Sequence, residues 1–402
     1  MPQRRGSVSR LIQYGSSNSE NSGSSTSAKA KDGTAEFDLL VLDGSNRLYV
    51  MDKQGVARKT IGGPGTAPGD FLNARGLAIS EDGEYAYVAD TGNNRIQRFR
   101  IHDSQLQAIA GGKPRPGMQH ASYGLGSLPG GEFKPKRFAL ESLDQPHGIA
   151  IHGDRLFVCD TWNHRVVVLS TALPTNFVGL ARATSDEVPV IPELQALKYW
   201  GTKGRDTGCF QYPKGIAIDP GDANLGIAPE VIVADTRNHR LQCFTLDGKF
   251  TRGVSGERNE SSSGMPGRMK GSQLFSFPSS VHVSTQSGRH VFVADQRAIV
   301  VLNLATLEPT CVLALSNPSR QRSARPATQS PATLCGHMAP MQKGVPPTLL
   351  LYVAEYDEHA VREVVLTPTH LRNDEIDATA SINIFERRHK PAASLQVFAR
   401  QH

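Results

Sequence analysis

The chain has 402 residues, of which 38% are hydrophobic and 20% charged, and its formal net charge is +6. No apolar run approaches the roughly 18 residues of a membrane helix, so this composition argues against an α-helical membrane protein. The five cysteines form no CxxC motif or Cys/His cluster. This argues against a RING or B-box zinc module and favours reduced thiols.

The N-terminal 36 residues are rich in Ser and Gly and contain few apolar side chains. We predict that residues 1–36 are a disordered tail. The tail has no apolar stretch of the kind found in signal peptides, so we expect a cytoplasmic protein, with the nucleus as the second choice. Ser7 follows Arg4 and Arg5, a spacing that suits a basophilic kinase, and is therefore a candidate regulatory phosphorylation site.

A repeated dodecamer dominates the rest of the chain. It reads VADTGNNRIQRF at 88–99, VCDTWNHRVVVL at 158–169 and VADTRNHRLQCF at 233–244. In each copy an Asp is followed by Asn three residues later and Arg five residues later, in a pattern that can hold a tight turn. The flanking apolar runs are short and rich in β-branched residues, which predicts strands. Such a unit cannot bury its own apolar face, so several copies must pack together.

These copies resemble the NHL repeat. In the second copy, QPHGIAI (145–151), LFVCD (156–160) and TWNHR (161–165) follow the order of the family's PxGIAV strand, YVAD strand and TxNHR turn. Gly-rich links that end in an aromatic residue, another family feature, occur at 63–71 and 201–210. The resemblance implies a β-propeller in which each blade has a further, outermost strand. Candidates for that strand precede a Gly at 56–61, 106–110 and 250–255.

Weaker copies of the repeat surround Asp43, Asp295 and Glu355. With the three strong copies they make six units, so we predict that residues 37–402 form an all-β, six-bladed β-propeller of four-stranded antiparallel blades. The spare length predicts long inter-blade loops at 111–142, 181–209, 256–276 and 316–347.

Closure of the ring has several solutions in the sequence. The run SLQVFA (394–399) could supply the missing innermost strand of the first blade. The segments 8–15 and 381–385 compete to complete the last blade. Closure in some form is expected, because it removes sheet edges that would otherwise pair with other chains.

Positive charge is concentrated in two of the predicted loops. Loop 111–142 has five basic residues against two acidic ones, and loop 316–347 has four basic residues and no acid. The residue before the innermost strand is Arg75, His147, Lys214 or Ser279 in four of the units, and these positions would surround the central channel on the same face. The predicted binding residues are Arg75, His147, Lys214, Lys113, Arg115, Lys134, Lys136, Arg137, Arg320, Arg322 and Arg325.

A basic face of this kind fits an acidic protein or a nucleic acid. We expect a protein partner first and RNA second, with no membrane partner and no motif for reading DNA sequence. The NHL resemblance implies an interaction scaffold: Brat-type members bind single-stranded RNA on this face, and TRIM-type members recruit substrates for ubiquitin transfer. Aromatic residues able to stack on bases are few near this face; they are Tyr123, Phe133, Phe138 and Tyr212.

The alternative is a metal-dependent lyase or lactonase-type propeller enzyme with a site in the channel. The related amidating lyase has a zinc site and carries His at the PHxxA position of more than one blade, but here only His147 occupies that position. The repeated acids belong to the turn motif, and the chain has no GxSxG or Walker A motif. We therefore predict no catalytic residue, no metal and no cofactor.

Overall fold

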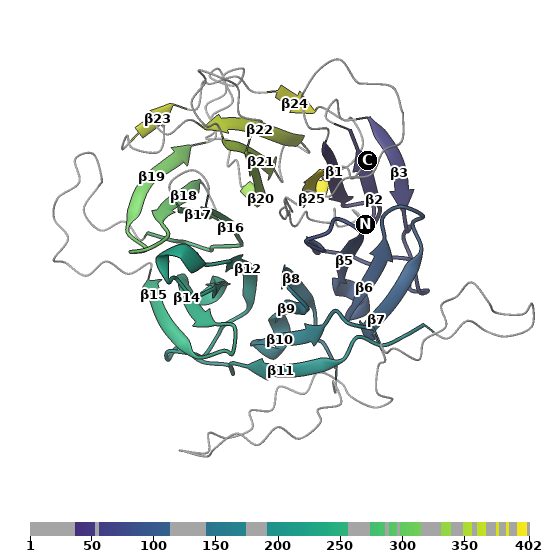
Figure 1. Cartoon of the computed structure of the whole chain (residues 1–402), viewed down its shortest axis with the longest axis horizontal. Coiled ribbons are helices and arrows are strands. Elements are labelled where there is room, and N and C mark those ends of the chain that lie inside the picture. Colours follow the sequence, from purple (N-terminus) through teal and green to yellow (C-terminus); the bar gives the residue numbers. More distant parts are fainter. Residues whose placement is uncertain are drawn as a thin grey trace, which may run out of the picture.

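The computed structural model describes residues 37–52, 56–112, 142–173, 191–255, 274–285, 289–295, 298–314, 331–338, 349–355, 360–366, 375–377, 383–385 and 392–399. Within these residues the strands form sheets that stand around a common axis like the blades of a propeller (Figure 1). The prediction of an all-β propeller of four-stranded antiparallel blades is confirmed.

The sheets of the described residues follow one another along the chain. In order from the axis outward, they are β25 (Ala392–Ala399), β1 (Phe37–Asp43), β2 (Leu48–Met51) and β3 (Ala57–Ile61); β4 (Gly76–Ile79), β5 (Tyr85–Asp90), β6 (Arg95–Arg100) and β7 (Leu106–Gly111); β8 (Pro146–His152), β9 (Arg155–Asp160), β10 (Arg165–Ser170) and β11 (Ala196–Trp200); β12 (Pro213–Asp219), β13 (Glu230–Asp235), β14 (Arg240–Thr245) and β15 (Phe250–Ser255); β16 (Ser280–Ser284), β17 (His290–Ala294), β18 (Ile299–Asn303), β19 (Pro309–Ala314) and β23 (Glu375–Asp377); and β20 (Pro331–Met338), β21 (Leu349–Glu355), β22 (Ala360–Leu366) and β24 (Asn383–Phe385). The innermost strands contact one another in the order β25, β4, β8, β12, β16, β20 and back to β25.

Alternating side chains of a strand contribute to two different cores. Ala86 and Val88 of β5 join the core shared with the preceding blade, whereas Tyr87 and Ala89 join the core shared with the following blade. This is the period of two expected of a strand. Because both faces of the inner strands are buried between blades, the runs are apolar throughout, which explains why they do not alternate with polar residues.

Glycines allow the innermost strands to approach closely. A Cβ atom at Gly76 would lie 2.0 Å from the carbonyl oxygen of His147 on the next blade. A Cβ atom at Gly215 would lie 2.7 Å from the Cβ of Ala234 and 3.2 Å from the carbonyl oxygen of Ser279. The Gly of the repeat is therefore a packing requirement between neighbouring blades.

The ring is closed by the C-terminal strand. β25 pairs antiparallel with β1, with Leu39 opposite Val397 and Val41 opposite Leu395. Of the solutions left open by the sequence, residues 394–399 thus supply the innermost strand of the first blade. The segment 381–385 contributes β24, the outermost strand of the last sheet, and residues 8–15 lie outside the described residues.

Two of the predicted loops contain strands, so the loop prediction is wrong at these residues. β11 lies within 181–209 and pairs with β10, and β20 lies within 316–347 and pairs with β21. Neither segment carries the repeat motif, because an outermost or diverged strand is specified by the neighbour with which it pairs. The positions predicted as loops at 113–141, 181–190, 256–273, 316–330 and 339–347, like the predicted tail 1–36, lie outside the described residues.

Two segments cross to the preceding blade before they form an outer strand. The backbone before β11 pairs in parallel with β7, where the N–H of Ile109 donates to the carbonyl of Pro192 and the N–H of Leu194 donates to the carbonyl of Ile109. β23 likewise pairs in parallel with β19. These crossings, which the sequence did not predict, cover part of an outer sheet edge.

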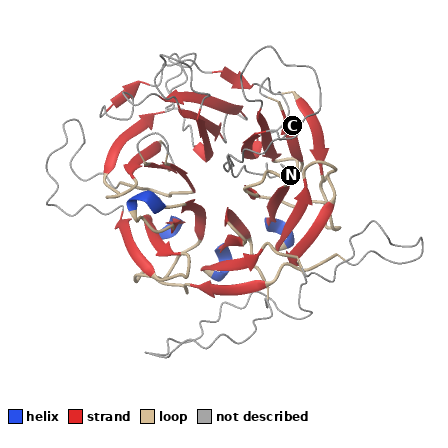
Figure 2. Cartoon of the chain, viewed as in Figure 1, coloured by secondary structure: helices blue, strands red, loops and turns tan. Residues whose placement is uncertain are grey.

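Helix is confined to short 3-10 turns in the described residues, such as Thr91–Asn93, Thr161–Asn163 and Thr236–Asn238 (blue in Figure 2). No helix of these residues is long and apolar enough to cross a membrane.

Removal of residues 392–402 should open the ring. The first sheet would lose its innermost strand and expose the edge of β1, so we expect a lower thermal midpoint, a broader unfolding transition and concentration-dependent association. Calorimetry and light scattering measure these effects. The matched control removes only residues 400–402 and should behave like the full chain; equal stability of the two truncated forms would contradict closure by β25.

Candidate functional site

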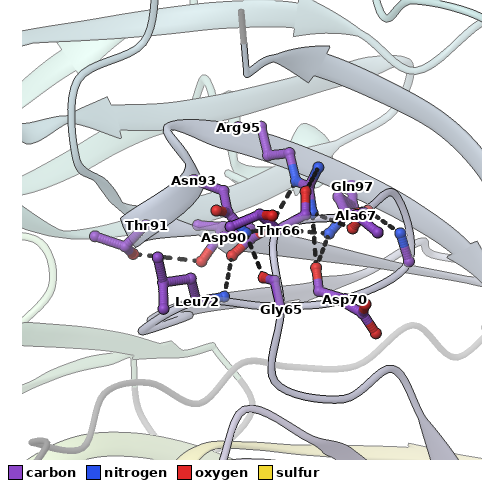
Figure 3. Close-up of polar contacts among 12 residues, drawn as sticks. Gly65, Thr66, Ala67, Asp70, Leu72, Asp90, Thr91, Asn93, Arg95 and Gln97 are labelled. Atoms are coloured by element: carbon purple, nitrogen blue, oxygen red, sulfur yellow. Dashed lines mark hydrogen bonds and ion pairs between the residues drawn. The ribbon is translucent and has the colours of Figure 1, made fainter. Parts of the chain in front are cut away.

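The repeated turn of the second blade is built around the buried carboxylate of Asp90 (Figure 3). Its Oδ1 accepts a hydrogen bond of 2.7 Å from the backbone N–H of Leu72. Its Oδ2 accepts from Asn93 Nδ2 at 2.8 Å, Arg95 Nε at 2.7 Å and Gln97 Nε2 at 3.1 Å. The three positions of the sequence pattern, Asp, Asn and Arg, therefore meet at one carboxylate.

Arg95 extends this network to the Gly-rich link before the blade. Its guanidinium donates to the backbone carbonyls of Thr66, Ala67 and Asp70 at distances of 2.6–3.0 Å. Arg240 makes the equivalent bonds in its own blade, to the carbonyls of the link that ends at 210. The repeated Arg residues are thus fully engaged in the blade, as the sequence pattern indicated.

The same arrangement recurs in the next two blades. Asp160 accepts from Asn163 and Arg165, and Asp235 accepts from Asn238 and Arg240, all at 2.7–2.9 Å. Burial, the largest influence, raises the pKa of both carboxyls, and the donated hydrogen bonds and the Arg charge act in the opposite direction.

The weaker copies keep the acid but use backbone donors. Asp295 accepts from the N–H groups of Ser276 and Phe277. Asp43 accepts from those of Ser45 and Arg47. The Asp295 copy has lost the Asn and Arg positions, and its acid still holds the turn through these backbone donors. The Asp43 copy keeps Asn46 and Arg47, with one residue fewer in the turn.

Two further repeat positions join neighbouring blades. Thr91 Oγ1 donates to the carbonyl of Pro146 at 2.6 Å, and Thr161 Oγ1 donates to that of Pro213 at 2.7 Å. His164 Nδ1 accepts from the N–H of Tyr212 at 3.1 Å. Sequence reasoning assigned His164 no special role; its role depends on the next blade, about 50 residues away, and no local signal could reveal it.

The predicted positions Arg75, His147 and Lys214 lie at the starts of β4, β8 and β12, which contact one another around the axis. All three side chains are half-buried. Burial lowers the pKa of Lys214, and the neighbouring charges of Arg75 and Arg237 lower it further. Cations from two blades therefore act on one ammonium group, and no carboxylate of the described residues is among the charges that shift its pKa.

Arg237 was missed by sequence reasoning because it occupies the variable position of the DTxN turn. Its guanidinium lies 4.7 Å from the centroid of the Tyr212 ring. Trp162, at the same position of the preceding blade, makes an edge contact of 5.9 Å with that ring and is 45% exposed. A comparison of the three turns could have identified both residues, because the second blade has Gly92 at the position where the next two blades have large side chains.

The other predicted residues belong to parts of the chain beyond the described ranges. These are Lys113, Arg115, Lys134, Lys136, Arg137, Arg320, Arg322, Arg325 and Ser7, together with the aromatic candidates Tyr123, Phe133 and Phe138.

Metal-ligating side chains do not gather in groups of three or more within the described residues. His147 Nδ1 lies 2.9 Å from the carbonyl oxygen of Gln145, to which it donates. Cys159 and Cys243 are buried in strands and form no disulfide within the described residues, and burial raises the pKa of the Cys243 thiol to about 12.

Replacement of Asp160 by Asn should strongly destabilise the protein. The Arg165 guanidinium would lose its buried counter-charge, and we expect the free energy of unfolding to fall by about 3 kcal/mol. Urea denaturation measures this change. The exposed pair of Arg100 and Asp103 provides the control: Asp103→Asn should cost about 0.5 kcal/mol or less. Equal effects of the two substitutions would contradict the structural role of the buried acid.

His164 should make the fold sensitive to acid. Burial, and then the charge of Lys203, lower the pKa of its imidazole to about 4, below the unfolded value of about 6.5. The stability that depends on the neutral ring is present above pH 6.5 and is lost as the pH falls toward 4, by about 3 kcal/mol at pH 4.5.

The matched variant is His164→Asn, because Asn94 makes the equivalent bond in the preceding blade with its Oδ1. This variant should lose less stability between pH 7 and 4.5 than the parent in urea titrations. Parallel pH profiles would rule out His164 as the titrating group.

Comparison with known proteins supports the repeat assignment. Residues 143–169 match the family model of the NHL repeat. No curated protein is detectably similar to the chain. Among solved structures, the chain is similar to one from a nidogen/laminin complex, with 13% identity, a TM-score of 0.49 and coverage of 90% of this chain and 98% of the other. It is also similar to a protein of unknown function from Bacteroides caccae, with 11% identity, a TM-score of 0.48 and coverage of 92% and 100%.

A third similar structure holds the RRP9 WD40 repeats, with 12% identity, a TM-score of 0.45 and coverage of 91% of this chain and 85% of that one. Similarity at this level carries no argument about function. Residues 143–169 are thus an NHL repeat, and the buried Asp of this repeat accepts hydrogen bonds from Asn and Arg in the same way as the acids of the blades before and after it.

Proposed function

We propose that the protein is a non-catalytic, six-bladed NHL-repeat scaffold that binds a macromolecular partner through its basic face. The observation that carries this proposal is that the charges of Arg75 and Arg237, which belong to two different blades, both act on the partly buried ammonium group of Lys214. Cations brought together in a partly desolvated place repel one another, and an acidic partner would relieve that repulsion.

A protein is the preferred partner and RNA is the second candidate. Trp162 is 45% exposed and contacts the Tyr212 ring over which Arg237 lies. Large aromatic residues and Arg are typical of the centres of protein interfaces. The basic residues of the two predicted loops, 111–142 and 316–347, would extend the surface. Phosphorylation of Ser7 would place negative charge beside the basic tail and could modulate binding.

A role in substrate recognition for a ubiquitin ligase is part of this proposal. It rests on the resemblance to TRIM-NHL proteins and requires a RING domain from another chain, in the cytoplasm or nucleus. The second candidate function is a metal-dependent lyase or lactonase-type enzyme; stoichiometric zinc or calcium in the purified protein would favour it over the scaffold.

Substitution of Arg75 and Lys214 by Ala should abolish partner capture without unfolding the protein. Crosslinking in cell extract, followed by identification of bound proteins and RNA, compares this double variant with the parent chain. If RNA is the partner, the logarithm of its affinity should fall with the logarithm of salt concentration, with a slope of about −0.7 per phosphate contact. Capture of the same partners by the parent and the double variant would exclude this face.

A further inference from the structure

Four side chains between the third and fourth blades form a compact group, which we call the aromatic–cationic patch: Trp162, Tyr212, Lys214 and Arg237. The Trp162 and Tyr212 rings meet edge to face at an interplanar angle of 88°. Arg237 lies over the Tyr212 ring, and Lys214 follows Tyr212 by two residues. The exposed Trp162 ring and the Arg237 guanidinium thus contact the same Tyr212 ring, and the charge of Arg237 acts on Lys214.

The repeated turn does not need the side chains of Trp162 and Arg237. Trp162 and Arg237 occupy the variable position of a turn that is held by Asp, Asn and Arg, and Gly92 occupies it in the second blade without any side chain. The three turns nevertheless have the same backbone geometry, with left-handed residues at Asn94, His164 and His239. Side chains dispensable for the turn are available for recognition.

The conformation of Tyr212 is set by the scaffold. Its φ is +51°, in the left-handed region, and its backbone N–H donates a hydrogen bond to His164 Nδ1. His164 also packs against the Tyr212 ring with a centroid distance of 4.5 Å. Contacts from Trp162, His164 and Arg237 thus hold the ring, so the patch is organised before any ligand arrives, which lowers the entropy cost of binding.

Resting on the proposed function, we infer that the aromatic–cationic patch binds an acidic peptide segment, with a carboxylate between Lys214 and Arg237 and an adjacent apolar side chain against Trp162. Guanidinium and ammonium groups make strong, charge-assisted hydrogen bonds with carboxylates. The apolar side chain would cover the exposed surface of Trp162 and exclude water from the ion pairs.

The geometry favours a peptide over single-stranded RNA at this place. Base stacking requires an accessible aromatic face, whereas the Tyr212 ring has a guanidinium over it and ring contacts from Trp162 and His164. Trp162 presents exposed surface beside a cation, an arrangement that suits a carboxylate next to an apolar side chain.

Trp162 supplies the readout for the test. The chain has two tryptophans, and the other, Trp200, packs between Phe157 and Phe244 in the third and fourth blades. Titration of the full chain at low salt with a short peptide of glutamate and leucine should change the Trp162 emission in a saturable way. The variant Trp162→Phe should show no such change, and a lysine–leucine peptide should have no effect on the parent chain.

Lys214→Met and Arg237→Met should each weaken the binding of the acidic peptide about tenfold, as expected for the loss of one charge-assisted hydrogen bond. Lys249→Met, which removes an exposed positive charge in the turn between β14 and β15, should leave it unchanged. Circular dichroism confirms that each variant is folded.

Two results would overturn the inference. One is the absence of saturable binding of the acidic peptide, or binding unaffected by Lys214→Met and Arg237→Met. The other is tighter binding of an oligouridylate than of the acidic peptide, with the Trp162 response following the RNA. The second result would leave the proposed function intact, whereas capture of the same partners by the Arg75/Lys214 double variant would refute the proposed function itself.

Discussion

In the second, third and fourth blades, one buried carboxylate per blade organises the local structure. Asp90, Asp160 and Asp235 each hold the turn that follows the second strand and the backbone that leads into the innermost strand. A buried carboxylate is costly unless donors surround it, and here the Asn and Arg of the repeat supply them. Each acid accepts from the backbone N–H of Leu72, Asp144 or Gln211, just before the innermost strand. The hub therefore also fixes the backbone that leads to Arg75, His147 and Lys214.

The blades are then joined by bonds that only the assembled ring can make. The hydroxyl groups of Thr91 and Thr161 donate hydrogen bonds to the backbone carbonyls of Pro146 and Pro213 in the next blade. Glycines such as Gly76 allow the innermost strands to approach closely. Repeat proteins of this kind depend on such nearest-neighbour interfaces. The ring differs from an open array in that β25 returns to β1, so its first and last blades also have neighbours.

The repeat pattern was sufficient to predict strands, turns and the structural role of the Asp, Asn and Arg positions, because these interactions lie within one blade. It did not reveal β11 or β20, since those strands are specified by pairing with their neighbours. Nor did it reveal His164 or Arg237, whose partners are on other segments. Arg75 and Lys214 were predicted from their aligned positions, but the mutual influence of their charges required the structure.

In the proposed scaffold, the positions that build the blade are distinct from the positions that recognise a partner. Trp162→Ala tests this separation most directly when the free energy of unfolding and partner capture are both measured on the same preparation. The account predicts a loss of at most about 1 kcal/mol of stability, the size of an aromatic edge contact, together with a clear loss of capture. A large loss of stability with capture retained would contradict it.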